Sequence, residues 1–210
     1  MNVEREHLAE NGLYLPVMEH FLTIQGEGYH SGRAAYFVRL GGCDVGCVWC
    51  DVKESWDATA HEVMSVNDIL SIIKGSGADF VVITGGEPFM YDLGPLTALL
   101  NDNELEVAVE TAGVYPITGE FDWICFSPKK FKKPIEEYYA MADELKVVVF
   151  NKHDLEWAEE HAARISEGCL QYLQPEWDKR NEMLPLVIDH VKKHPTWRIS
   201  LQTHKYINVP

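Results

Sequence analysis

The stretch Cys43-Asp44-Val45-Gly46-Cys47-Val48-Trp49-Cys50 places three cysteines within eight residues, at the spacing C-x3-C-x2-C. Thiolates this close together can hold a metal centre, because they are soft ligands suited to iron–sulfur clusters, zinc or Cu(I). A closed zinc site or a fully ligated cluster needs four protein ligands, and no fourth cysteine lies nearby. Three cysteine ligands therefore leave one coordination position open, where a small molecule can bind.

A C-x2-C pair by itself is often a zinc site or a redox pair. Here Cys43 adds a third thiol, Trp49 directly precedes the last cysteine, and Gly85-Gly86-Glu87-Pro88 follows downstream. These features agree in kind and in order, and together they favour an iron–sulfur cluster with an open position. Cys125 and Cys169 stand apart in apolar segments, and we expect both to be small buried side chains rather than ligands.

The composition is that of a soluble globular protein. With 210 residues, 46% of them hydrophobic and 24% charged, the chain has the length of one domain. Its net charge of −15 argues against nucleic-acid binding, which rests on neutralising phosphates with Lys and Arg. The N-terminus shows no apolar leader and the chain no long apolar run. Clustered cysteines suit a reducing compartment, so we expect a cytoplasmic protein that binds no membrane.

Strand patterns alternate with helix patterns along most of the chain. Residues 1–15 form a polar lead-in, and residues 16–210 form one domain. Strands are expected at 17–24, 34–40, 80–83, 106–110, 123–126, 144–149, 169–173 and 198–201, and helices at 65–75, 93–100, 135–142, 153–165 and 181–193. This alternation predicts a parallel sheet with right-handed crossovers. Because the chain is short for a closed barrel, the expected fold class is α/β, an open partial barrel of the (βα)6 type with about six strands.

Segments rich in polar residues, Gly and Pro nearly all follow the C-terminal ends of these strands, where α/β folds place their active sites. The glycines of Gln25-Gly26-Glu27-Gly28 allow a ligand to approach the backbone closely. Those of Gly85-Gly86 expose carbonyl groups that suit an ammonium group. Arg39 interrupts an apolar strand. It is either a solvated edge residue or a carboxylate clamp that faces a cavity.

The cysteine spacing resembles the signature of the radical S-adenosylmethionine (SAM) enzymes, in which SAM occupies the open position of a [4Fe–4S] cluster. The segment Thr84-Gly85-Gly86-Glu87-Pro88 resembles the part of those enzymes that holds the methionine amino group. Together with Thr23-Ile24-Gln25-Gly26-Glu27-Gly28, Arg39 and the short chain, it is similar to the 7-carboxy-7-deazaguanine synthase family over residues 19–210. That family contracts the ring of 6-carboxy-5,6,7,8-tetrahydropterin to give 7-carboxy-7-deazaguanine and ammonia, a step of queuosine biosynthesis.

The resemblance implies a role for particular residues. Cys43, Cys47 and Cys50 would bind the cluster, and Ile24, Gln25, Gly26, Arg39, Thr84 and Pro210 would contact the pterin. The residues implied around SAM are Trp49, Cys50, Asp51, Gly86, Glu87, Ser127, Pro128, Lys129, Gln174, Pro175, Glu176 and Trp177. A substrate carboxylate suits the guanidinium of Arg39, which can bind it through two hydrogen bonds. We expect Pro210 to be ordered and to contribute through its main-chain carboxylate.

The resemblance also implies a mechanism. The reduced cluster passes one electron to SAM, and the resulting 5′-deoxyadenosyl radical removes hydrogen from C6 of the substrate before the ring contracts with help from Mg2+. An electron donor such as flavodoxin and a homodimeric assembly are expected on the same ground. The chain departs from the family at Val52. The family commonly has Thr or Ser there, whose side chain touches Mg2+, so no side-chain oxygen is expected from this position.

Two other functions share parts of this pattern. A glycyl-radical enzyme activase has the same cysteine spacing, but it binds a protein loop, which leaves Arg39 and the Gln25-Gly26-Glu27 turn unexplained. A non-enzymatic zinc or iron–sulfur module would cleave no SAM, and it gives no role to the polar segments at the strand ends.

Overall fold

The structure is a computed structural model that describes residues 11–210. Most of the expected lead-in, residues 1–10, lies outside the described residues. The first strand, β1 (Tyr14–Ile24), begins before residue 16, and Leu15 is fully buried in it. The last two residues of the expected lead-in are therefore part of the sheet.

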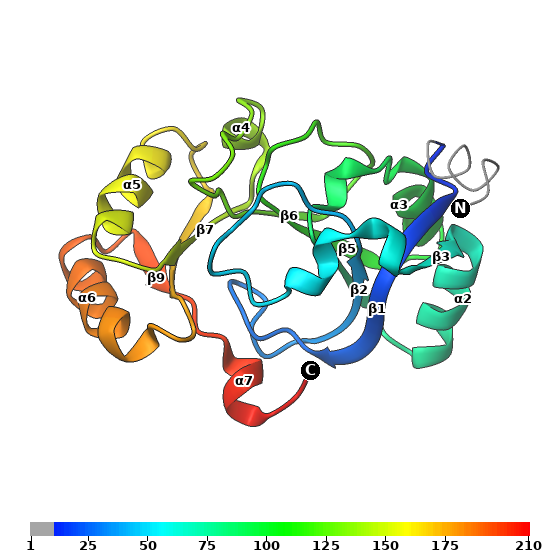
Figure 1. Cartoon of the computed structure of the whole chain (residues 1–210), viewed down its shortest axis with the longest axis horizontal. Coiled ribbons are helices and arrows are strands. Elements are labelled where there is room, and N and C mark those ends of the chain that lie inside the picture. The colour runs from blue at the N-terminus through cyan, green and yellow to red at the C-terminus, as the bar shows by residue number, and fades with distance from the viewer. Residues whose placement is uncertain (1–10) are drawn as a thin grey trace.

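Within residues 11–210, the strands form a single nine-stranded sheet in the order β3-β1-β2-β4-β5-β6-β7-β8-β9. The other strands are β2 (Ala34–Leu40), β3 (Glu62–Ser65), β4 (Phe80–Gly85), β5 (Glu106–Thr111), β6 (Trp123–Phe126), β7 (Glu144–Val149), β8 (Leu170–Pro175) and β9 (Trp197–Ile199). β1 pairs antiparallel with β2 and β3, whereas every pair from β2–β4 to β8–β9 is parallel. The sheet curves around the centre of the molecule without closing (Figure 1), so the predicted open partial barrel is confirmed.

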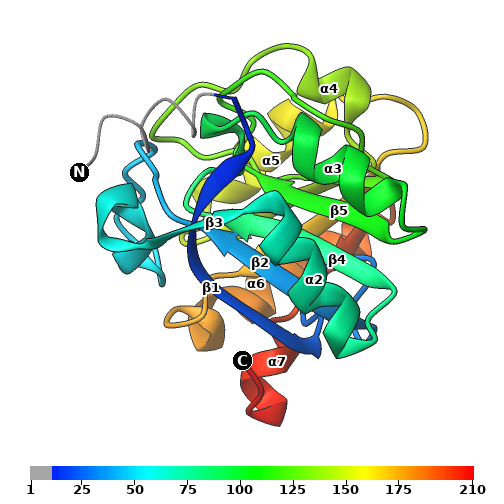
Figure 2. The same ribbon diagram turned by 90° about the vertical axis from the view of Figure 1, so that its right-hand side faces the viewer.

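The helices from α2 to α6 pack on the outer face of this sheet (Figure 1). They are α2 (Val66–Ser76), α3 (Gly94–Asn101), α4 (Tyr138–Met141), α5 (His153–Ala162) and α6 (Arg180–Lys193), and α7 (Thr203–Ile207) follows β9. Figure 2 shows α2 and α3 side by side over β4 and β5. The Ser65 side chain caps α2 by accepting the Asp68 N–H, and Gly77 ends the helix at φ +74°, a conformation that glycine adopts at little cost.

Strand alternation assigns each buried side chain to one of two layers. Val81 and Ile83 of β4 face the helices and join the main hydrophobic core. Phe80 and Val82 face the inside of the partial barrel, where they pack with Phe37. The same alternation in β7 turns Leu145, Val147 and Val149 toward the helices. Glu144, Lys146 and Val148 face the inside of the partial barrel, so β7 places two ionisable side chains there.

Three local features differ from expectation. No strand was expected between residues 40 and 80, but the four residues of β3 pair with β1 and lead directly into α2. The helix expected at residues 135–142 contracts to one turn in α4. No helix was expected after residue 201, but residues Thr203–Ile207 form α7. Within residues 11–210, no helix has the length and apolar character needed to cross a membrane.

Candidate active site

A cavity of about 250 Å³ opens at the C-terminal ends of the parallel strands. All the expected cluster ligands and pterin contacts line it: Cys43, Cys47, Cys50, Ile24, Gln25, Gly26, Arg39, Thr84 and Pro210. The expected SAM neighbours that line it are Trp49, Cys50, Asp51, Gly86, Ser127, Lys129, Gln174, Glu176 and Trp177. Residues spread over almost the whole chain are thus brought together in one enclosure.

The cysteine loop, residues 43–50, forms one wall of this cavity. Val45 and Cys47 pack against Ala112 and Val114, beyond the end of β5. The Asp44 carboxylate accepts hydrogen bonds from Tyr115 Oη (2.6 Å) and Lys132 Nζ (2.7 Å). Burial raises the pKa of the Cys47 thiol to about 11, so metal binding there must displace a proton. Three free thiols on one wall fit a cluster that leaves one iron for another ligand.

The glycine turn at the end of β4, Gly85-Gly86, packs against the backbone that leads into the cysteine loop. Gly86 N donates to Leu40 O (3.0 Å) and Glu87 N donates to Gly42 O (2.9 Å). A Cβ on Gly86 would lie 2.2 Å from Gly42 O, and Gly85 has φ +152°. These glycines are therefore required by the packing of the loop itself, in addition to any approach of a ligand to their carbonyls.

Three expected SAM neighbours, Glu87, Pro128 and Pro175, are buried and do not line the cavity. Glu87 is 1% exposed and turns away from the cavity. Its carboxylate accepts hydrogen bonds from Thr111 Oγ1 (2.6 Å) and Ala112 N (2.8 Å), and burial raises its pKa. Glu87 thus links the end of β4 to the end of β5 and holds these two segments in position.

A second wall of the cavity, which we call the polar wall, is a network of charged side chains. Lys146 Nζ lies 2.5 Å from Glu27 Oε2 and 3.2 Å from Glu110 Oε2, and its side chain is 4% exposed. Gln25 Nε2 donates to Glu110, and Gln202 Nε2 donates to Glu27, both at 3.0 Å. Although burial acts to raise it, the Lys146 ammonium and its hydrogen bond hold the pKa of Glu27 at about 2. Burial acts to lower the pKa of Lys146, but the acidic groups around it raise that pKa well above its usual value.

Sequence reasoning missed Glu110, Lys146, Gln202 and His204, which all line the cavity. One signal was available for Lys146, because it interrupts the apolar strand β7 in the way that Arg39 interrupts β2. The structure pairs Arg39 with Glu19, with Arg39 Nε 2.7 Å from Glu19 Oε1 and the Arg39 side chain 20% exposed. Arg39 is aligned with Thr84 of β4 in the parallel pairing, so the two expected pterin contacts are neighbours in the sheet.

The segment after β9 completes the cavity. Gly26 O accepts hydrogen bonds from Thr203 N (2.9 Å) and Thr203 Oγ1 (3.0 Å). A Cβ on Gly26 would lie 2.0 Å from His204 Nδ1, so the close contact with α7 requires glycine. Lys205 Nζ lies 2.8 Å from Asp51 Oδ2, which links α7 to the cysteine loop. Pro210 O accepts a hydrogen bond from Thr23 Oγ1 (3.0 Å), which places the end of this segment against β1.

Val52 lines the cavity but offers a poor contact for Mg2+. Its carbonyl already accepts two hydrogen bonds, from Ser55 N (3.1 Å) and Ser55 Oγ (2.7 Å). A carbonyl oxygen has two lone pairs, and the valine side chain has no oxygen. Residue 52 therefore does not fit a direct ligand of the ion.

Known proteins share both the sequence and the fold. Residues 37–150, more than half of the chain, match the radical SAM superfamily. A 7-carboxy-7-deazaguanine synthase from Flavobacterium psychrophilum is 53% identical over 96% of each chain. That of Synechocystis is 46% identical over 92% of this chain and 93% of the relative. The crystal structure of QueE from Escherichia coli superposes with a TM-score of 0.80 at 31% identity, covering 96% of this chain and 99% of the other.

The partial barrel and its open three-cysteine wall define a radical SAM enzyme. The match to the relatives extends over nearly the full length on both sides. The chain belongs to the 7-carboxy-7-deazaguanine synthase family of this superfamily.

Proposed function

We propose that this chain contracts the ring of 6-carboxy-5,6,7,8-tetrahydropterin to 7-carboxy-7-deazaguanine with release of ammonia, a step of queuosine biosynthesis. Family membership supports this activity. One observation carries it: the three cysteines and the residues implied for the pterin line the same cavity. A radical generated at the cysteine wall would therefore be formed next to the substrate.

The residues present fit two of the cofactors that the family implies, the cluster and SAM. Cys43, Cys47 and Cys50 would hold a [4Fe–4S] cluster, which when bound supplies the electron that cleaves SAM. Trp49, Gly86, Ser127 and the cavity-lining residues after β8 would surround SAM. Arg39 would pair with the substrate carboxylate, and the adjacent Thr84 hydroxyl would orient the ring. The polar wall of Glu27, Glu110 and Lys146 offers fixed acceptors and one cation to the nitrogen-rich pterin.

Mg2+ is the one implied cofactor that this chain fits poorly, because Val52 has neither a side-chain oxygen nor a free carbonyl lone pair. We derive no step through this ion. A homodimeric assembly is a proposal from the family resemblance, and a cytoplasmic location is a proposal from the clustered cysteines and the lack of a long apolar segment in the sequence.

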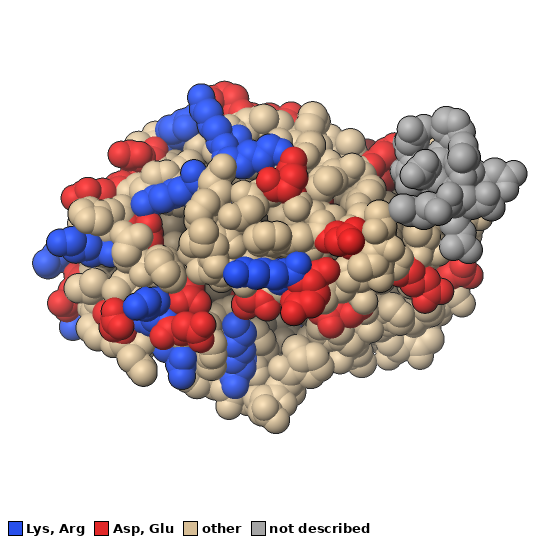
Figure 3. Space-filling model, viewed as in Figure 1, with Lys and Arg blue, Asp and Glu red and all other residues tan. Residues whose placement is uncertain are grey.

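We also infer that the one-electron donor is an acidic carrier protein, such as a flavodoxin. Lys130, Lys133 and Arg164 line a hollow beside α4 and α5, and basic side chains gather there at the top of the view in Figure 3. Lys130 pairs with Asp154 and Arg164 with Glu136. Lys132 from the same segment contacts Asp44 of the cysteine loop. In a chain of net charge −15, a basic patch beside the cluster would steer an acidic partner to it.

This docking proposal can be tested with two reductants. Lys133→Glu should slow turnover driven by flavodoxin and leave turnover driven by dithionite unchanged, because only the protein donor needs the patch. Equal slowing with both reductants would place the defect in the active site instead.

The function itself is tested by anaerobic cluster reconstitution, reduction, and incubation with SAM and 6-carboxytetrahydropterin. Mass spectrometry should detect 7-carboxy-7-deazaguanine, and Cys47→Ala treated in parallel should give none. SAM cleavage without any deazaguanine product would favour another radical SAM activity, such as a glycyl-radical activase. A colourless zinc protein that cleaves no SAM would overturn the enzyme assignment.

A further inference from the structure

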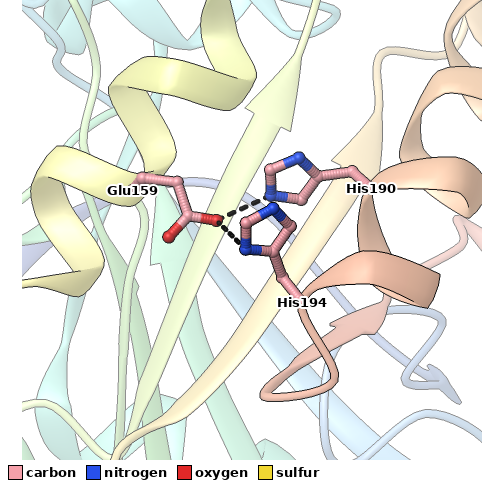
Figure 4. Close-up of side chains that lie close together, drawn as sticks. All are labelled: Glu159, His190 and His194. Atoms are coloured by element: carbon pink, nitrogen blue, oxygen red, sulfur yellow. Dashed lines mark hydrogen bonds and ion pairs between the residues drawn. The ribbon is translucent and has the colours of Figure 1, made fainter.

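A second group of metal-binding side chains lies away from the cavity, where α5, α6 and β9 meet (Figure 4). Glu159 belongs to α5, His190 to the last turn of α6, and His194 follows that helix directly. The candidate ligand atoms of these three side chains all lie within 4.8 Å of one another. The two imidazole rings are stacked, with their centroids 4.3 Å apart, because residues four apart share one face of a helix.

Three ring nitrogens lie near a single oxygen of Glu159. Trp197 Nε1 lies 2.9 Å from Oε1, His190 Nε2 lies 2.7 Å from it, and His194 Nδ1 lies 3.5 Å from it. A carboxylate oxygen has about two lone-pair sites, and the contacts of Trp197 and His190 with Oε1 occupy them, so His194 Nδ1 lies beside this oxygen without a hydrogen bond to it. The indole of Trp197 is a donor only and is 2% exposed. An imidazole nitrogen, in contrast, can present a lone pair in place of a proton.

A cation placed between the carboxylate and the two imidazoles could be bound by all three side chains, His194 included. Zinc lies about 2.0–2.2 Å from nitrogen and oxygen ligands, which puts neighbouring ligand atoms of a tetrahedral site about 3.3 Å apart. The separations of 2.7 Å and 3.5 Å between Glu159 Oε1 and the imidazole nitrogens lie on either side of that value. The Trp197 N–H would remain bonded to the carboxylate, as donors outside the ligand shell commonly are.

We propose that Glu159, His190 and His194 bind a divalent late first-row cation, Zn2+ foremost, with water in the remaining position. Two imidazoles and one carboxylate are a ligand set that zinc accepts. Lys192 and Lys193 lie in the same turn of α6, but both are exposed, and solvent screens charges of that kind.

The position of this site indicates a structural role. The cavity lies at the C-terminal ends of the strands, whereas His194 precedes β9 and His190 ends the helix that returns from the cavity edge. The ion would therefore lie at the N-terminal ends of the strands, where residues contribute to stability rather than to the reaction. It would join α5, α6 and the start of β9. The neighbouring strand β8 carries Gln174, and Gln202 follows β9, and both side chains line the cavity.

The proposal is tested by titrating Zn2+ into cluster-loaded protein under anaerobic conditions, since the cluster keeps Cys43, Cys47 and Cys50 from binding the added metal. Calorimetry should show one Zn2+ bound per chain, and Zn2+ should raise the Tm. Glu159→Gln and His194→Ala should weaken binding roughly tenfold or more and abolish the rise in Tm. His194 is exposed, so its replacement tests the site without threatening the fold.

His153→Ala is the matched control, because His153 is an exposed histidine of α5 outside the cluster. This variant should bind Zn2+ and gain stability as the parent does. Equal Zn2+ affinity in the parent and His194→Ala would overturn the proposal, and so would a parent protein that binds no stoichiometric ion. Neither readout depends on turnover, so the outcome is independent of the proposed ring contraction.

Discussion

The two walls of the cavity are built on different principles. The cysteine wall is held by backbone hydrogen bonds, such as Gly42 N to Ser55 O (2.6 Å), and by apolar contacts of Val45 and Cys47. The polar wall is held by side-chain charges, with Lys146 between Glu27 and Glu110. The first wall therefore depends mainly on backbone hydrogen bonds and apolar packing, whereas in the second wall the functional charged groups also make the contacts that hold the wall together.

This difference predicts that function and stability separate on one side of the cavity and coincide on the other. A thiol can be removed from the cysteine wall while its backbone frame persists. A charge removed from the polar wall leaves its partners buried and unpaired, which costs far more than the lost attraction alone. The following changes distinguish the two walls.

The largest effect on activity is expected from Cys47→Ala. With one of three cluster ligands gone, SAM cleavage should be abolished, as measured by formation of 5′-deoxyadenosine. The free energy of unfolding of the metal-free protein should fall by only about 1 kcal/mol, since the change removes one buried sulfur atom. Cys169→Ala, which removes a thiol that does not line the cavity, should keep SAM cleavage. Full cleavage by Cys47→Ala would break the cluster assignment.

Lys146→Met should have the largest effect on stability. It leaves Glu27 and Glu110 in the buried wall without their cation, so the free energy of unfolding in urea should drop by about 3–5 kcal/mol. Lys132→Met makes the same substitution on the cysteine wall, where Lys132 forms a part-exposed pair with Asp44. It should cost at most about 1 kcal/mol. Similar losses in the two variants would show that the walls do not differ as described.

The decrease in the free energy of unfolding at acid pH should reveal the protonation of Glu27. Its pKa is lowered from 4.5 to about 2 in the folded protein, so its contribution is fully present above pH 4.5 and is lost as the pH falls toward 2. The contribution is on the order of 3 kcal/mol. Urea unfolding between pH 6 and pH 2.5 should show this loss in the parent and a shallower slope in Glu27→Gln. Parallel curves for the two proteins would mean that Glu27 keeps an ordinary pKa.

A smaller effect is expected from Thr23→Val, which removes the hydroxyl that bonds Pro210 O without changing the side-chain shape much. The loss of about 1 kcal/mol should appear as a roughly fivefold rise in the KM for the pterin, with uncoupled SAM cleavage retained. Thr59→Val, at an exposed turn, is the control and should leave KM unchanged. An unchanged KM in Thr23→Val would show that this contact does not order the substrate side of the cavity.

The same contrast explains what the sequence alone could predict. The cysteine wall is encoded by short spacings, such as the loop at Cys43 and the turn at Gly86, and the open barrel follows from the strand and helix periods. The polar wall brings together residues that lie far apart in the sequence: Glu27, Glu110, Lys146 and Gln202. No local sequence pattern predicts that these residues are in contact. Glu87 does not line the cavity for a related reason: its motif fixes where the turn lies, but the donors Thr111 and Ala112 decide which way its side chain points.

The contact of α7 with Gly26 also has a consequence for the order of assembly on the ribosome. Thr203 and Gly26 are 177 positions apart, whereas the contacts of Gly42 and Asp44 with Ser55, Tyr115 and Lys132 are complete once residue 132 has emerged. Chains fold from the N-terminus during synthesis, and distant contacts form late. The contacts of the cysteine wall can thus form on a nascent chain whose α7 has not yet been synthesised, so this wall does not depend on the C-terminal segment for its assembly.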